Sequence, residues 1–343
     1  MSKAEKLTLF ETRGSARECG EQYGREYRLL IEGFYTQELK ILKLLRPNEK
    51  KYWATIKEFA PHSAAFISGM SERTSLSVYD LTLLALHEEA THADLDSSGH
   101  CSAIAVSGAR TKNGGSLIAQ NWDWQTNMFV WPSILRRKIT GTLATLTYNY
   151  PGLPSCCGIN EAGLALMWTG SGYYPSVRPA MGLPSYVLID EILRKRSVKQ
   201  ALSFLKSVPQ AGCFIFVIGD SSGCAVVVEG VNNRIEVVRA DPLLYRANLY
   251  GCAPAIKWSK QHRRLNPRKV HSLKRLAKFR SLTRTLPLPI SCSFLKSALS
   301  TPPILVDLRP AKITVDTLIA DADRRTLHYR RAGGRAWHSL SVL

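Results

Sequence analysis

The chain has 343 residues, of which 45% are hydrophobic, so it can bury a sizeable core and is not expected to be disordered. The longest apolar run is too short to cross a membrane, and no secretory signal is recognisable, so we expect a cytoplasmic protein. None of the eight cysteines forms a CxxC pair, which leaves zinc ribbons and thioredoxin-type sites without support. We expect these thiols to be reduced.

The N-terminal part is predicted to be mostly helical. Apolar side chains recur at helical spacing over 14–45, and further helices are expected over 52–70 and 78–93. The helical pattern ends at Asp94, where the polar stretch LDSSGH indicates a loop.

A β-hairpin is predicted next, over residues 101–124. The apolar strand CSAIAVSG is followed by a turn signal at Asn113-Gly114 and by a second strand, SLIAQNWDW. Because Cys101 and Asp123 are about equally far from this turn, the ladder should bring them to the same open end. Spacing leaves about two residues of uncertainty in the register.

The remainder alternates strands with helices. A helix is expected over 184–205, and the basic stretch 255–285 should be helical in part. Strands are predicted over 144–150, 164–168, 214–219, 224–229, 235–240, 314–320 and 326–331. This order favours a layered α+β domain over a parallel βαβ fold.

Cys101 is a candidate nucleophile because it opens a strand after a polar loop. If the chain were cut before it, its own α-amine, with a pKa near about 8, could take the proton of its thiol. Such a site would still need an oxyanion donor and a group that holds the amine. Asn248, in YRANLYG, could donate its amide, and Asp123, between two tryptophans, could hold the amine. Taken alone, Asn248 is more simply interpreted as a turn residue and Asp123 as a cap.

Several motifs, in order along the chain, resemble one family. They are Gly14-Ser15 with Gly20 and Gly24, GHCSAIAV at 99–106, QNWDW at 120–124, GINEAGLAL at 158–166, GLPSYVLIDEIL at 182–193 and SKQHR at 259–263. Together they resemble the acyl-coenzyme A:6-aminopenicillanic acid acyltransferase (isopenicillin N acyltransferase-like) family, and QNWDW is the most specific match.

The resemblance implies a four-layer αββα sandwich of the N-terminal-nucleophile (Ntn) hydrolase type, formed by residues 1–343 as a single domain. It implies self-cleavage between His100 and Cys101, giving a small subunit, 1–100, and a large one, 101–343, that stay associated. Cys101 would be the nucleophile, Asp123 a site residue and Asn248 the oxyanion donor. The substrate would be a small N-acyl amide or acyl thioester, including a coenzyme A ester, whose acyl group passes to water or an amine. No metal or cofactor is expected.

This chain departs from the family pattern in three places. His100 stands before the nucleophile, where a small or acidic residue is usual, and Leu249 follows Asn248, where the family has His. The family also has an arginine near its C-terminal strands. This chain has no clear counterpart of it, and Arg309 is the nearest candidate.

The basic stretch 255–285 supports a competing hypothesis. It contains eleven Lys and Arg and no acidic residue. These eleven positive charges equal more than half of the net charge of the chain, which is +19. Its charges are most simply a solvated helix face, but they could bind an acidic ligand such as coenzyme A, nucleic acid or an anionic membrane. In that case the chain would be an uncleaved, weakly catalytic binding protein. Nucleic acid is not the expected partner, because it would not explain QNWDW or GINEAGLAL.

A cysteine protease of the Cys-His type is the other enzyme considered. None of the eight histidines lies in a papain- or caspase-like context, and no GxSxG elbow occurs. His87, His92 and His100 precede Cys101 and are interpreted as surface or capping residues.

Overall fold

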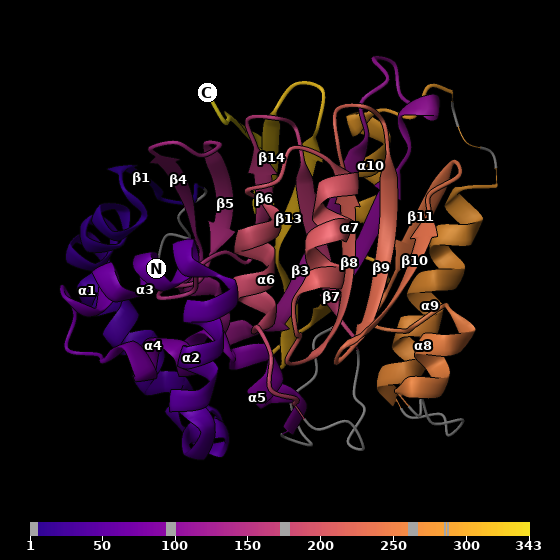
Figure 1. Ribbon diagram of the computed structural model, residues 1–343. Helices are drawn as coiled ribbons and strands as arrows, with labels where there is room; N and C mark the ends of the chain where they lie inside the picture. Colours follow the sequence, from indigo (N-terminus) through magenta and orange to yellow (C-terminus); the bar gives the residue numbers. More distant parts are fainter. Residues whose placement is uncertain (1–5, 94–100, 172–178, 260–266, 285, 287) are drawn as a thin grey trace.

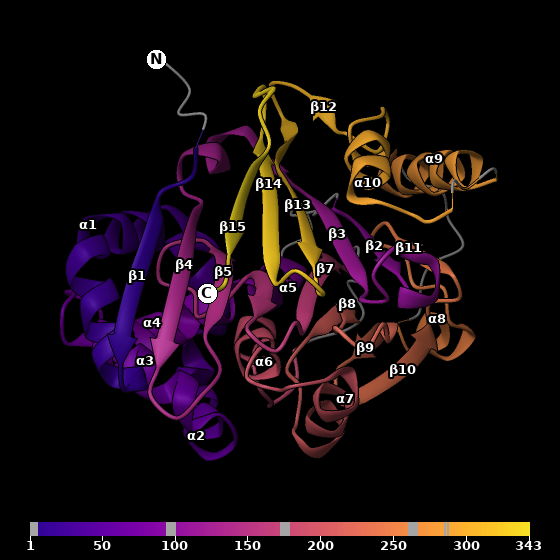
Figure 2. The same cartoon turned by 90° about the horizontal axis from the view of Figure 1, so that it is seen from above.

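The computed structural model describes residues 6–93, 101–171, 179–259, 267–284, 286 and 288–343, and every structural statement below concerns these residues. Two β-sheets lie face to face, and helices cover the outer face of each (Figures 1 and 2). This is the four-layer αββα arrangement, so the predicted fold class is confirmed.

The larger sheet has eight strands. In spatial order they are β1 (Leu9–Gly14), β4 (Ser133–Ile139), β5 (Thr145–Asn149), β6 (Cys157–Asn160), β7 (Ala165–Gly170), β8 (Cys213–Gly219), β9 (Ala225–Val231) and β10 (Arg234–Arg239). All neighbours are antiparallel except β1 and β4, which run parallel. Every residue of β8 and β9 is buried, which explains why both sequences are apolar apart from Glu229, whose carboxylate pairs with Arg246.

The second sheet contains the predicted hairpin. In spatial order its strands are β11 (Leu243–Arg246), β2 (Ser102–Val106), β3 (Leu117–Gln125), β13 (Lys312–Asp321), β14 (Thr326–Arg331) and β15 (His338–Ser341), and β12 (Asp307–Leu308) pairs with β13. Ser102 pairs with Asn121 and Val106 with Leu117, so Cys101 lies just beyond the paired end of the hairpin. The connection is the loop 107–116 rather than a tight two-residue turn, and it includes the 3₁₀ helix η2 (Gly108–Arg110).

Helices from the N-terminal part pack against the β1 end of the larger sheet (Figure 1). They are α1 (Ala16–Leu42), α2 (Glu49–Phe59), α3 (Pro61–Ser71), α4 (Val78–Ala85) and α5 (His87–Ala93), with the 3₁₀ helix η1 (Lys43–Asn48) between α1 and α2. A capping box at Ser15 starts α1. The single helix predicted over 52–70 is two helices, because Pro61 has no N–H to continue the first. The helix predicted over 78–93 is likewise divided, at Leu86.

The remaining helices lie further along both sheets. They are α6 (Ser185–Ile192), α7 (Val198–Ser207), α8 (Ala253–Trp258), α9 (Pro267–Leu282) and α10 (Cys292–Leu299). The helix predicted over 184–205 is therefore also a pair, α6 and α7. Helices α9 and α10 contact β11, β3 and β13 and cover the outer face of the second sheet (Figure 2).

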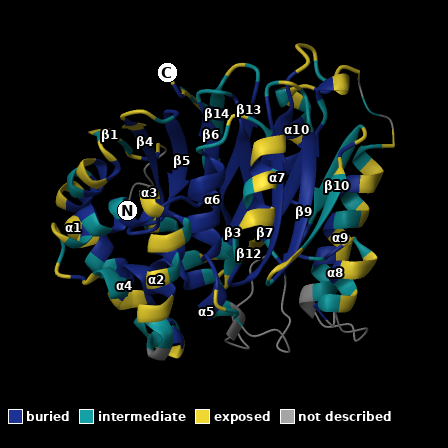
Figure 3. Ribbon diagram, viewed as in Figure 1, coloured by how far each residue is buried: buried dark blue, intermediate teal, exposed yellow. Residues whose placement is uncertain are grey.

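One hydrophobic core joins the N-terminal helices to the sheets. Tyr23 and Phe34 of α1 belong to the same cluster of buried apolar side chains as Trp122 of β3 and Leu166 of β7. Burial is deepest in the strands, whereas exposed residues lie on the outer faces of the helices (Figure 3). Residues on both sides of position 100 thus build a common core. Within the described chain, no helix combines the length and the apolar character needed to span a membrane.

Candidate active site

Cys101 lies at the start of β2 with its side chain turned inward. Its exposed fraction is 8%, and its Sγ accepts a hydrogen bond from the backbone N–H of Asp123 at 3.5 Å. The predicted proximity of Cys101 and Asp123 is thus present in the structure. Burial, together with the nearby Asp123 carboxylate, raises the pKa of the Cys101 thiol to about 12. The thiol therefore needs a base before it can attack a carbonyl.

Asp123 is buried on β3 and is held from the neighbouring strand. Its Oδ1 accepts a hydrogen bond from Thr314 Oγ1 at 2.5 Å, next to a register shift between β3 and β13. Its Oδ2 lies 3.8 Å from Arg275 Nη1 and has no hydrogen-bond partner among the described residues. Burial raises the pKa of Asp123 to about 8, although Arg275 acts in the opposite direction.

Asn248 joins the same group from the segment that follows β11. Its backbone φ of 60° lies in the left-handed region, which Asn tolerates better than most residues. Its Nδ2 donates to Thr169 Oγ1 at 2.7 Å and to the carbonyl of Gly170 at 2.8 Å. Thr169 Oγ1 in turn donates to the carbonyl of Cys101 at 3.3 Å. Both amide hydrogens of Asn248 are therefore engaged, and one bond must open before it can donate to a substrate oxygen.

Arg275 links all three predicted residues, and the sequence analysis missed it. This side chain of α9 is fully buried. Nη1 donates to the carbonyl of Cys101 at 2.6 Å, and Nη2 donates to Asn248 Oδ1 at 2.8 Å. In the sequence it is one of eleven cations in a stretch interpreted as a solvated face. The available signal is its helical spacing from Ser272 and Phe279, which are also buried.

The other two predicted residues are not brought into this group. Arg309 follows β12, its side chain is 62% exposed, and it forms two hydrogen bonds with Asp307, of 2.7 and 2.6 Å. His100, the residue before the predicted cut, lies outside the described residues.

A pocket opens beside Cys101, and its wall is aromatic and acidic. The described lining residues are Glu38, Ile41, His87, Glu88, Thr91, Cys101, Trp122, Asp123, Trp124, Gln125, Met128, Trp168, Gly170 and Tyr186. His87, expected at the surface, is instead buried and lies 2.9 Å from the Glu38 carboxylate, so that expectation was wrong. Three carboxyl groups and no Lys or Arg are among these lining residues, although the whole chain carries +19.

Glu88 makes the stability of the fold depend on pH. Burial and the neighbouring Glu89 raise the pKa of Glu88 to about 8, because both disfavour the charged form. A carboxyl whose pKa is raised by folding stabilises the fold below its unfolded pKa, and this contribution is lost as pH rises through about 8. Glu88→Gln should therefore differ little from the wild type near pH 5, just above the unfolded pKa, but exceed its free energy of unfolding by roughly 1–3 kcal/mol near pH 9.

Urea unfolding at the two pH values measures this difference. Glu58→Gln on α2 is the matched control. Because Glu58 is exposed, this variant should have the same free energy of unfolding as the wild type at both pH values. If Glu88→Gln changed the free energy of unfolding by the same amount at pH 5 and pH 9, the raised pKa of Glu88 would be contradicted.

The family model for acyl-coenzyme A:6-aminopenicillanic acid acyl-transferase matches residues 109–339, more than half of the chain. The matched region begins after Cys101 and contains Asp123, Asn248 and Arg275. No match was found among curated protein sequences.

Two solved structures are similar to this chain. A variant of conjugated bile acid hydrolase from Clostridium perfringens has 14% sequence identity and a TM-score of 0.50, with 70% of this chain and 92% of that chain covered. Penicillin V acylase from Agrobacterium tumefaciens has 13% identity and a TM-score of 0.47, with coverages of 70% and 86%. The extent of the family match shows that this chain belongs to the acyl-coenzyme A:6-aminopenicillanic acid acyl-transferase family, an Ntn-type family of acyltransferases and amidohydrolases.

Proposed function

We propose that the protein is a cysteine amidohydrolase or acyltransferase that activates itself by cleavage between His100 and Cys101. The contact that carries the proposal is that between Cys101 Sγ and the Asp123 N–H, 3.5 Å long. This contact supports the proposal because the sulfur of the proposed nucleophile lies beside a backbone N–H directed at it. The carbonyl of Cys101 is held by Arg275 and Thr169, which fixes the residue in this position.

Self-cleavage starts with the Cys101 thiol. Sγ attacks the carbonyl carbon of His100, the peptide C–N bond breaks, and the nitrogen becomes the free α-amine of Cys101. Water then hydrolyses the thioester, which leaves a carboxylate on His100 and restores the thiol. In this step the thiol proton passes to the departing nitrogen. Once released, the amine, with a pKa near about 8, is the base for the thiol in every later turnover. Asp123 Oδ2, which has no hydrogen-bond partner among the described residues, holds the protonated amine.

Turnover uses the same atoms on a substrate amide or thioester. Cys101 Sγ attacks the acyl carbon, and the oxyanion accepts hydrogen bonds from the Asp123 N–H and from Asn248 Nδ2. Asn248 exchanges its bond to Thr169 Oγ1 for the oxyanion, while its bond to Arg275 keeps the amide oriented. The Cys101 ammonium protonates the leaving group, and water or an amine then takes the acyl group from sulfur.

The pocket favours an apolar acyl group and disfavours anionic substrates. Trp122, Trp124 and Trp168 provide an aromatic wall beside Cys101. The pKa of Glu38 is lowered although burial acts in the opposite direction, because His87 and Gln37 bond to its carboxylate, so its charge repels a carboxylate and attracts an amine. Aryl or alkyl acyl amides with neutral or cationic leaving groups should therefore be better substrates than amides of amino acids.

Intact mass spectrometry of the purified protein tests this function. Cleavage before Cys101 divides the 38.2 kDa chain in proportion to its 100 and 243 residues, giving fragments of about 11 and about 27 kDa. After brief exposure to an acyl p-nitroanilide, the larger fragment should carry one acyl group. A full-length chain that gains no acyl group contradicts the proposal, and coenzyme A binding by that chain would support the alternative based on 255–285.

Asn248 can be tested separately as an oxyanion donor. Asn248→Asp keeps the size of the side chain and its acceptor for Arg275 but removes the amide hydrogens. We expect kcat to fall about 10²–10³-fold, as for the loss of one oxyanion-hole donor. Steady-state kinetics measures the effect, and the unfolding midpoint checks that the fold is retained. A folded variant with the wild-type kcat would remove Asn248 from the mechanism.

A further inference from the structure

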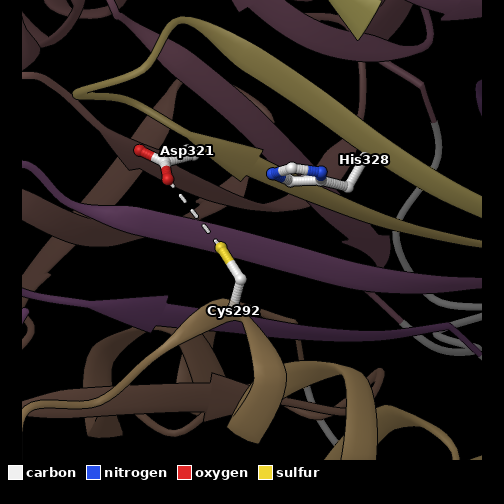
Figure 4. A group of neighbouring side chains, drawn as sticks. All are labelled: Cys292, Asp321 and His328. Atoms are coloured by element: carbon white, nitrogen blue, oxygen red, sulfur yellow. Dashed lines mark hydrogen bonds between the residues drawn. The ribbon is translucent and has the colours of Figure 1, made fainter. Parts of the chain in front are cut away.

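Three side chains that commonly bind metals converge on the outer face of the second sheet, beneath α10 (Figure 4). Cys292 is the first residue of α10, Asp321 is the last of β13, and His328 lies on β14. Their ligand atoms all lie within 4.8 Å of one another, and Cys292 Sγ is 3.8 Å from Asp321 Oδ2. Ligands of one tetrahedral zinc ion lie about 3.3–3.8 Å apart, given zinc–ligand bonds of about 2.0–2.3 Å. Only small shifts separate the three atoms from that geometry.

Strand pairing positions two of these ligands before any ion binds. Asp321 pairs with Thr326 and Ile319 pairs with His328, so Asp321 and His328 are diagonal neighbours on one face of the hairpin. His328 Nδ1 lies 2.7 Å from Ser339 Oγ on β15, and Figure 4 shows the imidazole turned toward Asp321 and Cys292. A hydrogen bond at one ring nitrogen is the usual support for a histidine that binds metal through the other.

The site is open on one side, and two cations stand beside it. Cys292 and Asp321 line a cavity of about 240 Å³, which is large enough to admit a hydrated ion. Arg324 Nε is 3.9 Å from Asp321 Oδ2, but its side chain is 65% exposed and can turn into solvent. Lys296 Nζ lies over the ring of Trp337, 5.0 Å from its centroid. Both charges oppose a bound cation, so their removal should strengthen binding.

We propose that Cys292, Asp321 and His328 bind one Zn²⁺ ion, with water as the fourth ligand. Thiolate, imidazole and a single carboxylate form a donor set that suits zinc better than calcium or magnesium, which require mainly oxygen ligands. The ion would tie α10 to the β13–β14 hairpin. Asp321 lies seven residues along β13 from Thr314, the partner of Asp123, which is roughly 20 Å of extended chain. The ion is therefore structural and independent of the proposed reaction.

Titration of the purified full-length or self-cleaved protein with Co²⁺ tests the site. One equivalent should produce a thiolate-to-cobalt absorption band and the visible bands of a tetrahedral ion, and Zn²⁺ should abolish both. Cys292→Ser and His328→Gln should remove the bands. Ser339→Ala should weaken binding about 10-fold by freeing the imidazole. Arg324→Ala should strengthen it.

Cys224→Ser is the matched control, since Cys224 is another partly exposed free thiol, and this variant should keep the wild-type bands. Absence of stoichiometric binding, or persistence of the bands in Cys292→Ser, would overturn the proposal. Chelation should lower the unfolding midpoint of the wild type and leave its amidase activity unchanged. If no metal binds, the proposed amidase function is unaffected. If no amidase activity is found, the proposed metal site is likewise unaffected.

Discussion

Cys101→Ala should remain a single 38.2 kDa chain and lose amide turnover by about 10⁶-fold, the loss seen when a nucleophile is removed. Without sulfur at position 101, neither the thioester of self-cleavage nor the acyl-enzyme can form. Cys101→Ser separates the two steps, because a hydroxyl can attack the neighbouring peptide bond slowly but is a poorer nucleophile than a thiolate toward the substrate. It should mature in part and remain nearly inactive. Intact mass and initial rates measured on the same samples distinguish these results.

A second cysteine provides the control for this experiment. Cys252 is a partly exposed free thiol, and Cys252→Ala should mature and turn over substrate like the wild type. If Cys101→Ala were cut at the same position, cleavage would be the work of another protease. If it kept its activity, the nucleophile would lie elsewhere.

Arg275→Met should lower the free energy of unfolding by about 3–5 kcal/mol, as expected when one partner of a buried ion pair is removed. The substitution removes the cation beside the buried Asp123 carboxyl group and the hydrogen bonds that Arg275 donates to the backbone carbonyl of Cys101 and the side-chain oxygen of Asn248. These groups belong to Cys101 and Asn248, the proposed nucleophile and oxyanion donor. We therefore expect kcat to fall by at least about 10²-fold even in molecules that remain folded.

Arg137 offers a matched control for the loss of stability. It is also fully buried and pairs with Asp190, but it is not among the residues that contact Cys101 or Asn248. Arg137→Met should destabilise the fold to a similar degree and leave kcat per folded molecule unchanged. Urea unfolding and active-site titration of both variants provide the measurements. Equal kcat values in the two variants would reduce Arg275 to a purely structural residue.

The hairpin at the centre of the site could be predicted because its determinants are local. Two short apolar runs separated by turn residues predict β2 and β3, and their spacing from the turn brings Cys101 toward Asp123. The shared motifs added Asn248, which strand geometry alone would not have selected. Strand spacing and family motifs are both read from short stretches of sequence, in which the residues that determine the local structure lie close together.

Arg275 and β1 show where such reasoning ends. A guanidinium in a basic helix is buried only if the opposing surface offers acceptors, and those acceptors come from positions 101, 123 and 248. Strand β1 pairs in parallel with β4, which lies more than one hundred residues away in the sequence. No local turn connects the two strands, so no short sequence signal predicts their pairing. In both cases the decisive partner is distant in sequence, and a single sequence records no such pairing.

The parallel pairing of β1 with β4 has a consequence for assembly. Strand β1 and helix α1 precede position 101, whereas β4 follows it, so the proposed cleavage would convert an internal strand pair into a contact between two polypeptides. The N-terminal fragment would then remain part of the folded protein and would not be a discarded propeptide. Because it supplies both an edge strand and part of the core, a large fragment produced alone should be insoluble, and co-expression of 1–100 should rescue it in trans. Maturation would therefore leave a heterodimer whose interface was built while it was still a single chain.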